Sequence, residues 1–320
     1  MEIEAISLTE LGGRLHVELT DLRVFVSVAR AGGITKAARE LHTVQSNISA
    51  RIASLEKELG ALVFRRHARG VVLTSAGEQL LPYARQILRL AGEARRAVQD
   101  ESPGGPLRIG SLETTAGVRL PAVLAAFTAD CPEVDLSLVT GPTDDLVRAV
   151  LDYELDGALV TGPVRNPELD ESVMFLEQLV VVTSRWCHSL DEALRGQPGP
   201  RLLVFRSGCS YRRGLESLVR SRGVLPSKVL EYGTLDGILG CVAAGLGITM
   251  LPDVVVEAYR ERELLRPHAP AADEGTAETV FVRRVDSAPT AALNRFVEQV
   301  RGSTAPAAFR AVDGAASTPA

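Results

Sequence analysis

Apolar residues recur every three or four positions through the first hundred residues, and this spacing predicts a group of amphipathic helices. The expected helices cover residues 21–30, 35–41, 45–59 and 75–100. Thr20 and Thr35 are expected to cap the first two helices, and Gly60 is expected to end the third. Residues 64–74 combine arginines with a β-branched run, which predicts a small basic hairpin.

The pattern changes after the Ser-Pro-Gly-Gly-Pro segment at 102–106, which is typical of a linker. Short apolar runs then alternate with amphipathic stretches, as in α/β proteins. The expected strands cover residues 107–110, 134–140, 157–160, 179–183, 201–205, 229–232, 248–251 and 281–283. The expected helices cover residues 120–129, 144–151, 211–222, 235–244 and 291–300. Two such series predict two α/β subdomains joined by crossing strands, with a cleft between them.

The helix expected over residues 45–59 has one apolar face and one face of small or short polar side chains. The apolar face holds Ile48, Ile52, Leu55 and Leu59, the opposite face holds Ser46, Ser49, Ala50 and Ala53, and Gln45, Asn47 and Arg51 lie at the edges. Small side chains let a helix approach a DNA major groove, where Gln and Asn make bidentate hydrogen bonds to adenine. The alternative is an ordinary polar helix start on a protein surface. The arginine-rich hairpin and long helix that follow favour DNA binding.

Candidate DNA-contacting residues come from two helices and the hairpin. The hairpin arginines would neutralise phosphate charge without reading sequence. The candidates are Thr35, Lys36, Gln45, Ser46, Asn47, Ser49, Arg51, Arg65, Arg66 and Arg69.

The formal net charge of -5 hides an uneven distribution along the chain. Residues 19–99 carry 13 Arg and Lys against 6 Asp and Glu, about +7, whereas residues 100–320 come to about -9. A basic N-terminal part on an acidic body fits a polyanionic partner at one end of the protein. Chance clustering of surface charge is the alternative explanation.

The chemistry-bearing residues do not suggest an enzyme or a metalloprotein. Cys131, Cys187, Cys209 and Cys241 lack Cys-x-x-Cys spacing, which argues against a zinc site or a disulfide framework and for a reducing cytoplasm. The N-terminus has no apolar signal core, and the longest apolar run, residues 237–252, is too short to span a bilayer. There is no Ser-His-Asp order, no His-Glu-x-x-His and no phosphate-binding glycine loop. We expect no catalytic residues, metal or cofactor.

These features together resemble the LysR family of transcriptional regulators. The matching positions, in order and spacing, are Leu22, Phe25, Thr35, Ala37, Ala38, Leu41, Gln45, Ser46, Ile48, Ser49, Ile52, Leu55, Glu56, Leu59, Gly60, Phe64, Arg66, Leu73, Thr74, Ala76 and Gly77. The resemblance continues through Leu80–Ala84 and covers residues 19–302. The sequence departs from the family at Gly33 and Val44, where the family usually has serines, so the caps of these helices differ. Asn47 replaces a residue that is commonly small in the family, so the family's base preference does not transfer.

The resemblance implies a fold class of α+β and α/β. The N-terminal part is a winged helix-turn-helix followed by a long linker helix, and the C-terminal effector domain is similar to periplasmic binding proteins, with two α/β subdomains. The expected organisation is an extension at 1–18, the winged helix-turn-helix at 19–78, the linker and dimerisation helix at 79–101, the effector domain at 105–302 and a disordered tail at 303–320. Subdomain I covers 105–163 and 269–302, and subdomain II covers 164–268.

An apolar stripe on the long helix is the candidate dimerisation surface. It comprises Leu80, Ala84, Ile87, Ala91, Ala94 and Val98. This stripe either packs against its own domain or meets a second subunit. The resemblance implies an antiparallel pair, and often a homotetramer. A homodimer also matches a double-stranded DNA operator with dyad symmetry.

Hydroxyl and glycine loops at the expected strand ends are the candidate effector site. They supply Ser111, Thr114, Thr115, Gly141, Thr143, Cys209, Ser210, Gly245 and Gly247. Each hydroxyl either caps a helix or contacts a small-molecule effector, for which an anionic metabolite is one candidate. Arg206, Arg212 and Arg213 either supply counter-charge or form surface ion pairs.

The resemblance implies a DNA-binding regulator whose effector closes the cleft, changes DNA bending, and recruits or blocks RNA polymerase. The alternative is an oxidant sensor that uses Cys209, because peroxide-sensing members of the family carry a reactive cysteine at this helix start. Those sensors have a resolving cysteine about two turns later. The nearest downstream cysteine here is Cys241, which favours a buried, unreactive thiol.

Overall fold

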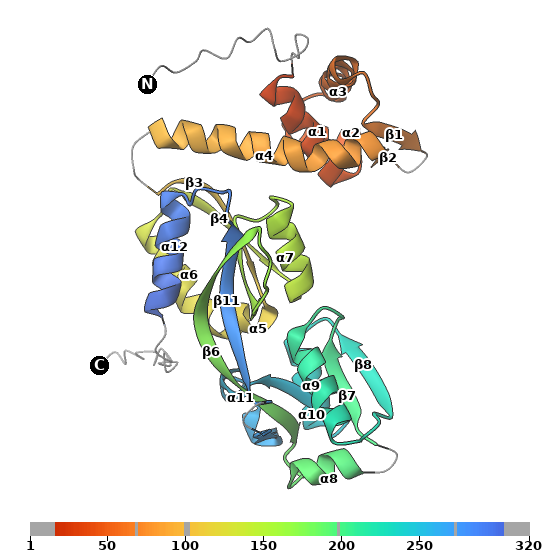
Figure 1. The fold of residues 1–320 in the computed structure, drawn as a ribbon, viewed down its shortest axis with the longest axis vertical. Helices are drawn as coiled ribbons and strands as arrows, with labels where there is room; N and C mark the ends of the chain where they lie inside the picture. The colour runs from red at the N-terminus through yellow and green to blue at the C-terminus, as the bar shows by residue number, and fades with distance from the viewer. Residues whose placement is uncertain (1–16, 68–69, 99–102, 197–198, 272–273, 304–320) are drawn as a thin grey trace, which may run out of the picture. The chain divides into compact units, whose positions relative to one another are not determined.

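The computed structural model describes residues 17–67, 70–98, 103–196, 199–271 and 274–303 (Figure 1). The chain divides into two compact units, residues 1–100 and residues 101–320. The extension predicted at 1–18 and the disordered tail predicted at 303–320 lie almost wholly outside the described residues. Among the helices that are described, none has the length and apolar character needed to cross a membrane.

The first unit contains helices and one small hairpin, as predicted. Its elements are α1 (Leu19–Ala31), α2 (Ile34–Glu40), α3 (Gln45–Leu59), β1 (Phe64–His67), β2 (Gly70–Leu73) and α4 (Ser75–Val98). β1 and β2 pair antiparallel, from Phe64 opposite Leu73 to His67 opposite Gly70. The predicted bounds of α3 are confirmed at both ends, including the stop at Gly60.

The apolar face of α3 lies in the core of this unit. Ile48 and Leu55 are fully buried, and Ile52 is 7% exposed. They share the core with Phe25 of α1, whose ring centroid lies 5.3 Å from that of Phe64 in β1. Burying each such side chain contributes about 1.5–3 kcal/mol. The buried face therefore fixes which side of α3 remains open to solvent.

The predicted starts of α1 and α2 are wrong, whereas the start of α3 is right and the ends of these three helices lie within one residue of the prediction. α1 begins at Leu19 rather than after Thr20, and α2 begins at Ile34, so Thr35 lies inside the helix. The N-cap positions of α1, α2 and α3 make no side-chain capping hydrogen bond. Tertiary packing, rather than capping, therefore decides where these helices begin.

Part of the stripe proposed for dimerisation packs inside its own unit. Ala84 is fully buried and Leu80 packs against the same core, so this part of the prediction is corrected. Ile87 is 42% exposed, and Ala94 is exposed as well. Ala91 is half-buried, and the side chain of Val98 lies outside the described part of the chain. Residues on a neighbouring line of α4, Tyr83 and Leu90, are 65% and 46% exposed.

The second unit has two lobes, which share two long strands. Lobe I contains β3 (Gly105–Ser111), α5 (Glu113–Val118), α6 (Leu120–Asp130), β4 (Val134–Thr140), α7 (Thr143–Leu151), β5 (Gly157–Gly162), β11 (Thr276–Arg284) and α12 (Ala291–Gly302). β3 pairs parallel with both β4 and β5, and β11 pairs antiparallel with β5. The carboxyl ends of β3, β4 and β5 therefore share one edge of the sheet.

Lobe II is a second α/β arrangement built onto the far half of β6 (Leu169–Ser184). It contains α8 (Leu190–Arg195), β7 (Arg201–Phe205), α9 (Ser210–Ser221), β8 (Lys228–Tyr232), α10 (Leu235–Ala243), β9 (Thr249–Pro252), α11 (Asp253–Glu257), the 3-10 turn Arg262–Leu264 and β10 (Leu265–His268). The strand order is β10-β6-β11-β5-β3-β4, and β9 pairs with β6 off this path. Figure 1 shows β6 and β11 running from one lobe into the other, which confirms the predicted crossing strands.

Several elements of the second unit were missed. Residues 111–115 were expected as a loop, but α5 places Thr114 and Thr115 in its first turn. Only residues 179–183 of the 16-residue strand β6 were predicted, because its first half has acidic and polar residues in an irregular burial pattern. Its pairing with β11 shifts register between Thr279 and Val280, which breaks the simple alternation.

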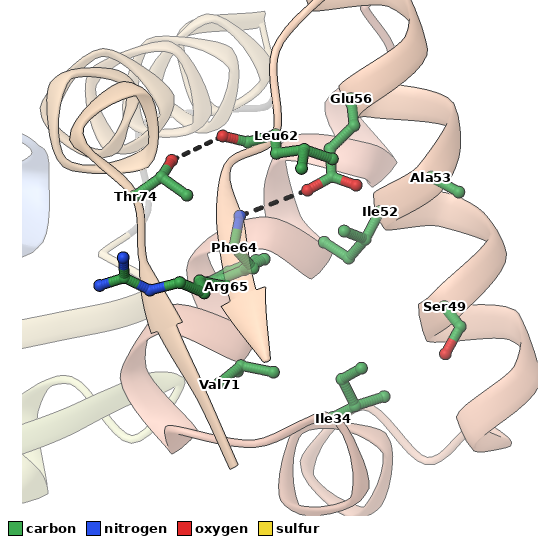
Figure 2. A pocket seen from close by; sticks show the side chains of 10 residues that line it. All are labelled: Ile34, Ser49, Ile52, Ala53, Glu56, Leu62, Phe64, Arg65, Val71 and Thr74. Carbon is green, nitrogen blue, oxygen red and sulfur yellow. Dashed lines mark hydrogen bonds between the residues drawn. The ribbon is translucent and has the colours of Figure 1, made fainter. Parts of the chain in front are cut away.

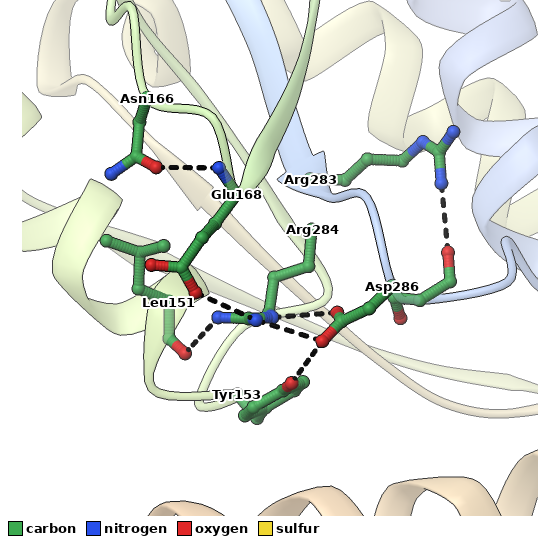
Figure 3. Close-up of polar contacts among 8 residues, drawn as sticks. Leu151, Tyr153, Asn166, Glu168, Arg283, Arg284 and Asp286 are labelled. Atoms are coloured by element: carbon green, nitrogen blue, oxygen red, sulfur yellow. Dashed lines mark hydrogen bonds and ion pairs between the residues drawn. The ribbon is translucent and has the colours of Figure 1, made fainter.

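A cluster around Arg284 fixes the amino edge of the lobe I sheet (Figure 3). Its guanidinium donates to Asp286, Glu168 and the carbonyl oxygen of Leu151, and lies 4.3 Å from the ring centroid of Tyr153. The Tyr153 hydroxyl donates to Asp286 at 2.6 Å. These contacts, led by the hydrogen bond that Arg284 donates to Asp286, raise the pKa of Arg284. The cluster joins the end of β11 to the chain that enters β5.

We predict that Phe25→Ala lowers the free energy of unfolding of the first unit by about 3–5 kcal/mol, because it leaves a cavity behind α3. Chemical denaturation of the full chain followed by circular dichroism measures the change. Leu62→Ala is the matched control, since Leu62 is 66% exposed in the same unit. An equal loss in both variants would contradict the packing described for α3.

Candidate DNA-binding surface and effector site

The start of α3 presents a row of polar side chains to solvent. Gln45, Ser46 and Asn47 are exposed, and threonine hydroxyls hold the side-chain amides of Gln45 and Asn47. The Thr35 hydroxyl donates to the amide oxygen of Gln45 at 3.4 Å, and the amide nitrogen of Asn47 donates to the Thr43 hydroxyl at 3.0 Å. The structure thus brings Thr35 of α2 to the predicted reading surface of α3.

Arg51 does not join this row. Its guanidinium donates to Glu18 at 2.7 Å and to Asp21 at 3.0 Å, and Asp21 is only 3% exposed. Hydrogen bonds to Asp21 and then to Glu18 raise the pKa of Arg51. Arg51 therefore has a structural role, because its side chain holds α3 to the first turn of α1, and its contact with DNA stays a prediction.

The remaining basic candidates lie on α2 and the hairpin. Lys36 and Arg65 are exposed. Arg66 lies opposite Val71 in the hairpin, but its side chain is outside the described set, and Arg69 is outside the described residues altogether. The hairpin therefore has an exposed arginine on its first strand, as expected for a wing.

A cavity of about 400 Å³ separates α3 from the hairpin (Figure 2). It is lined by Ile34, Ser49, Ile52, Ala53, Glu56, Leu62, Phe64, Arg65, Val71 and Thr74. The Glu56 carboxylate accepts from the backbone N–H of Val63 at 2.9 Å and from that of Phe64 at 3.3 Å, which ties β1 to α3. Ser49 borders this cavity and is half-buried, so it is less open to solvent than Ser46.

In lobe I, most of the predicted effector residues gather at the carboxyl edge of the sheet. Ser111 is fully buried at the end of β3, and its carbonyl accepts from the N–H of Gly141 at 3.2 Å. The Thr143 hydroxyl accepts from the N–H of Thr161 at 3.3 Å, so it already has a structural partner. Thr114 is 2% exposed, and its hydroxyl has no hydrogen-bond partner among the described residues. Thr115 is also buried.

The start of α9 in lobe II lies beside this edge of the lobe I sheet. Ser210 is half-buried and accepts from Arg213 at 2.8 Å, and Arg213 reaches Asp144 of lobe I at 3.5 Å. Arg212 pairs with Glu216 and Glu231, which supports the alternative of structural ion pairs for this residue. Arg206 is exposed at the end of β7.

Gly245 and Gly247 do not lie at this edge, so the prediction that these two glycines belong to the effector site is corrected. Gly245 follows α10 with φ 77°, which is a common way for a helix to end. A Cβ on Gly247 would lie 2.3 Å from the carbonyl oxygen of Arg201, at the amino end of β7. The glycine there allows two backbones to approach closely.

Three further contacts join the lobes, and sequence reasoning missed all of them. Glu113 accepts from the backbone N–H of Leu235 at 2.8 Å. Arg119 and Glu177 form a bidentate, nearly buried ion pair at 2.9 and 3.3 Å. The phenol of Tyr211, on the first turn of α9, lies near Thr114 and is 4% exposed. Its spacing from Leu215 and Leu218 makes Tyr211 look like an ordinary core residue in the sequence.

Cys209 does not have the environment of a reactive thiol. It is the N-cap residue of α9 but only 5% exposed, and burial raises its pKa more than the nearby backbone N–H groups lower it. A raised pKa means less thiolate, the reactive form, at a given pH. The oxidant-sensor alternative is therefore not favoured. Within the described ranges, no three His, Cys, Asp or Glu side chains gather as a metal site requires.

Comparison with known proteins gives the class to which these two parts belong. Residues 19–78 match the bacterial regulatory helix-turn-helix protein, lysR family, and residues 100–305 match the LysR substrate binding domain. The chain therefore belongs to the LysR family of transcriptional regulators, with an N-terminal helix-turn-helix and a C-terminal effector-binding domain.

Individual relatives agree over nearly the whole chain. The HTH-type transcriptional regulator GltR of Bacillus subtilis is 43% identical over 281 residues, which cover 88% of this chain and 95% of the relative. A crystal structure of full-length CbnR with its target DNA is 25% identical, covers 90% of this chain and 100% of that one, and has a TM-score of 0.61. A full-length OxyR variant from Pseudomonas aeruginosa shares the fold at 22% identity, with a TM-score of 0.70 and coverage of 89% and 98%.

We predict that N-ethylmaleimide modifies Cys209 of the native protein at least about tenfold more slowly than it modifies Cys187, which is half-buried. Mass spectrometry of peptides over a time course at pH 8 measures both rates. Equal rates, or loss of DNA binding as Cys209 alone is modified, would restore the oxidant-sensor alternative.

Proposed function

We propose that this regulator reads a dyad-symmetric DNA site with the exposed start of α3, in the cytoplasm, as a homodimer or homotetramer. Lys36 and the hairpin arginines contact phosphates and set the register, whereas Gln45, Ser46 and Asn47 face base edges. This proposal rests on the difference between the two faces of α3. On the buried face, Ile48, Ile52 and Leu55 are each at most 7% exposed. The opposite side begins with a row of exposed amides and hydroxyls.

The exposed apolar residues on α4 support a second copy of the chain as a partner. Tyr83, Ile87 and Leu90 are 65%, 42% and 46% exposed, and they follow one another at helical spacing. Apolar side chains on one side of a long helix are typical of a helix pair. Two copies would place two α3 helices on the two halves of a symmetric operator. RNA polymerase is the further partner through which bound regulator changes transcription.

The cleft between the lobes is the proposed site for a small anionic effector. Thr114 is the residue that best supports it, because its buried hydroxyl makes no well-formed hydrogen bond with any described residue, whereas the hydroxyls of Thr143 and Ser111 are used within lobe I. A ligand that bridges the lobes would change how lobe II sits on β6 and β11. Such a change couples the effector to DNA only if the ligand binds the two arrangements with different affinity.

We predict that Gln45→Ala weakens binding to the operator by about 1–3 kcal/mol, because a bidentate base contact is lost while the helix keeps its buried face. Electrophoretic mobility shift with the promoter fragment beside the gene measures the affinity. Gln79→Ala is the control, since Gln79 is an exposed glutamine on α4. Equal affinity in wild type and Gln45→Ala would refute the contact assignment.

We predict that Thr114→Val abolishes the effector response without weakening operator binding. The ligand-free variant should be at least as stable as wild type, because the substitution removes a buried hydroxyl that has no partner among the described residues. A reporter fused to the operator measures the response, and mobility shift measures DNA binding. Wild-type induction in the variant would remove Thr114 from the effector site.

A further inference from the structure

Val44 is an exposed apolar side chain at the start of the proposed reading helix. It occupies the N-cap position of α3 in an extended conformation, with φ -91° and ψ 150°, and it is 65% exposed. Ser, Thr, Asp and Asn are preferred at this position, because a side-chain oxygen accepts a hydrogen bond from a backbone N–H of the first turn. Val44 makes no such capping bond. It therefore stabilises α3 neither by capping nor by burial.

Asn47 lies next to Val44, one turn along α3. The backbone N–H of Asn47 donates to the carbonyl oxygen of Val44 at 3.1 Å, which closes the turn between the two residues. Positions three apart on a helix share one side, with about 5–6 Å between their Cβ atoms. Asn47 is exposed, as Val44 is. The two side chains therefore form one small patch that faces solvent.

Thr43 sets the direction of the Asn47 amide. The amide nitrogen of Asn47 donates to the Thr43 hydroxyl at 3.0 Å. This bond uses one of the two N–H donors of the amide. Among the residues that the structure describes, the Asn47 amide makes no other hydrogen bond. The amide oxygen and the second N–H donor are therefore open to a partner outside the unit.

The two groups of this patch match different base edges in the DNA major groove. An amide with an open oxygen and an open N–H binds the N6 amino group and N7 of adenine together. Guanine presents two acceptors there and cytosine presents a donor, so neither base satisfies both sides of the amide. The thymine methyl is the apolar group on the base edges, and an exposed branched alkyl side chain suits it. The patch therefore favours A·T pairs.

The spacing of the two side chains limits which bases they reach together. Successive base pairs lie about 3.4 Å apart along DNA, so Cβ atoms about 5–6 Å apart face the same base pair or neighbouring ones. A single exposed apolar residue is common on protein surfaces and identifies no partner by itself. Val44 differs because it lies between Thr43 and Gln45, in the row that faces the operator in the proposed function.

We propose that Val44 and Asn47 are specificity-determining residues for the operator. Val44 packs against the methyl group of a thymine, and Asn47 binds an adenine in the same or a neighbouring base pair of each half-site. Thr43 is a positioning residue that presets the Asn47 amide. This inference rests on the proposed function, in which the start of α3 reads DNA. Since the sequence departs from the family at both positions, the resulting base preference belongs to this chain.

The test uses the full-length protein and DNA with single groups removed from its bases. Footprinting on the promoter fragment locates the half-sites. Each thymine is then replaced by uracil, which lacks the methyl group, and each adenine by 7-deazaadenine, which lacks N7. In mobility shift, we expect uracil at one position of each half-site to weaken binding about fourfold per methyl. At the same or a neighbouring pair, 7-deazaadenine should weaken binding at least about fivefold.

Substitutions then connect each base group to one side chain through a double-mutant cycle. Val44→Ser should bind the thymine and uracil sites equally, and Asn47→Ala should lose the 7-deazaadenine effect. Leu62→Ser is the matched control, since Leu62 is 66% exposed in the same unit, and it should keep both effects. Val44→Ser should not lower the melting temperature, because serine can cap α3. A merely structural role of Val44 would change affinity for all sites alike.

Thr43 is tested by the same readout. Thr43→Val removes the hydroxyl that holds the amide and should reduce the 7-deazaadenine effect, whereas Thr43→Ser should retain it. An unchanged effect in Thr43→Val would show that Thr43 does not position the amide.

Several outcomes would overturn the assignment of bases. If uracil has no effect at any position, or keeps its full effect in Val44→Ser, Val44 does not contact a thymine methyl. If Asn47→Ala remains as sensitive to 7-deazaadenine as wild type, Asn47 does not bind adenine. Weaker binding by Gln45→Ala alongside these results would leave the proposed function intact and reject only this inference. If Gln45→Ala also binds with unchanged affinity, the proposed function fails as well.

Discussion

The burial of one face of α3 is the constraint on which the DNA-binding part of this protein depends. Ile48 and Leu55 are fully buried against α1 and the hairpin, and each contributes about as much as several surface contacts together. Since side chains on a helix have fixed directions, burying this face leaves Gln45, Ser46 and Asn47 outside. The ion pairs of Arg51 with Glu18 and Asp21 add a second tie between α3 and α1. The proposed reading surface is thus a consequence of core packing.

The second unit uses a different principle, in which two lobes share continuous strands and meet through both polar and apolar side chains. β6 and β11 carry the backbone connection. Glu113 of lobe I accepts from the backbone N–H of Leu235, Asp144 lies 3.5 Å from Arg213, and Leu112 of lobe I is buried in the core of lobe II. A ligand can change how the lobes sit only if it binds their two arrangements with different affinity.

Periodicity predicted the elements whose environment is simple. The bounds of α3, β4 and β7 came from apolar spacing alone, because each has one consistent buried pattern or a short uninterrupted run. The predicted starts of α1 and α2 were wrong because Glu18 and Gly33 occupy the N-cap positions without a capping side chain. The ion pair of Arg51 and the position of Tyr211 were not predicted, for a related reason. Arg51 contacts Asp21 and Tyr211 lies near Thr114, 30 or more positions away in the sequence, and such contacts leave no local signal.

The most direct test of the central claim is hydrogen–deuterium exchange of the full-length protein with and without its promoter DNA. If α3 reads the operator, exchange at the backbone N–H groups of residues 45–51 becomes slower when DNA binds, with a smaller effect over the hairpin at 64–73. The buried core residues of α3 should already exchange slowly without DNA. If DNA protects only segments outside the first unit, or leaves residues 45–51 unchanged at saturating concentration, α3 does not read the operator.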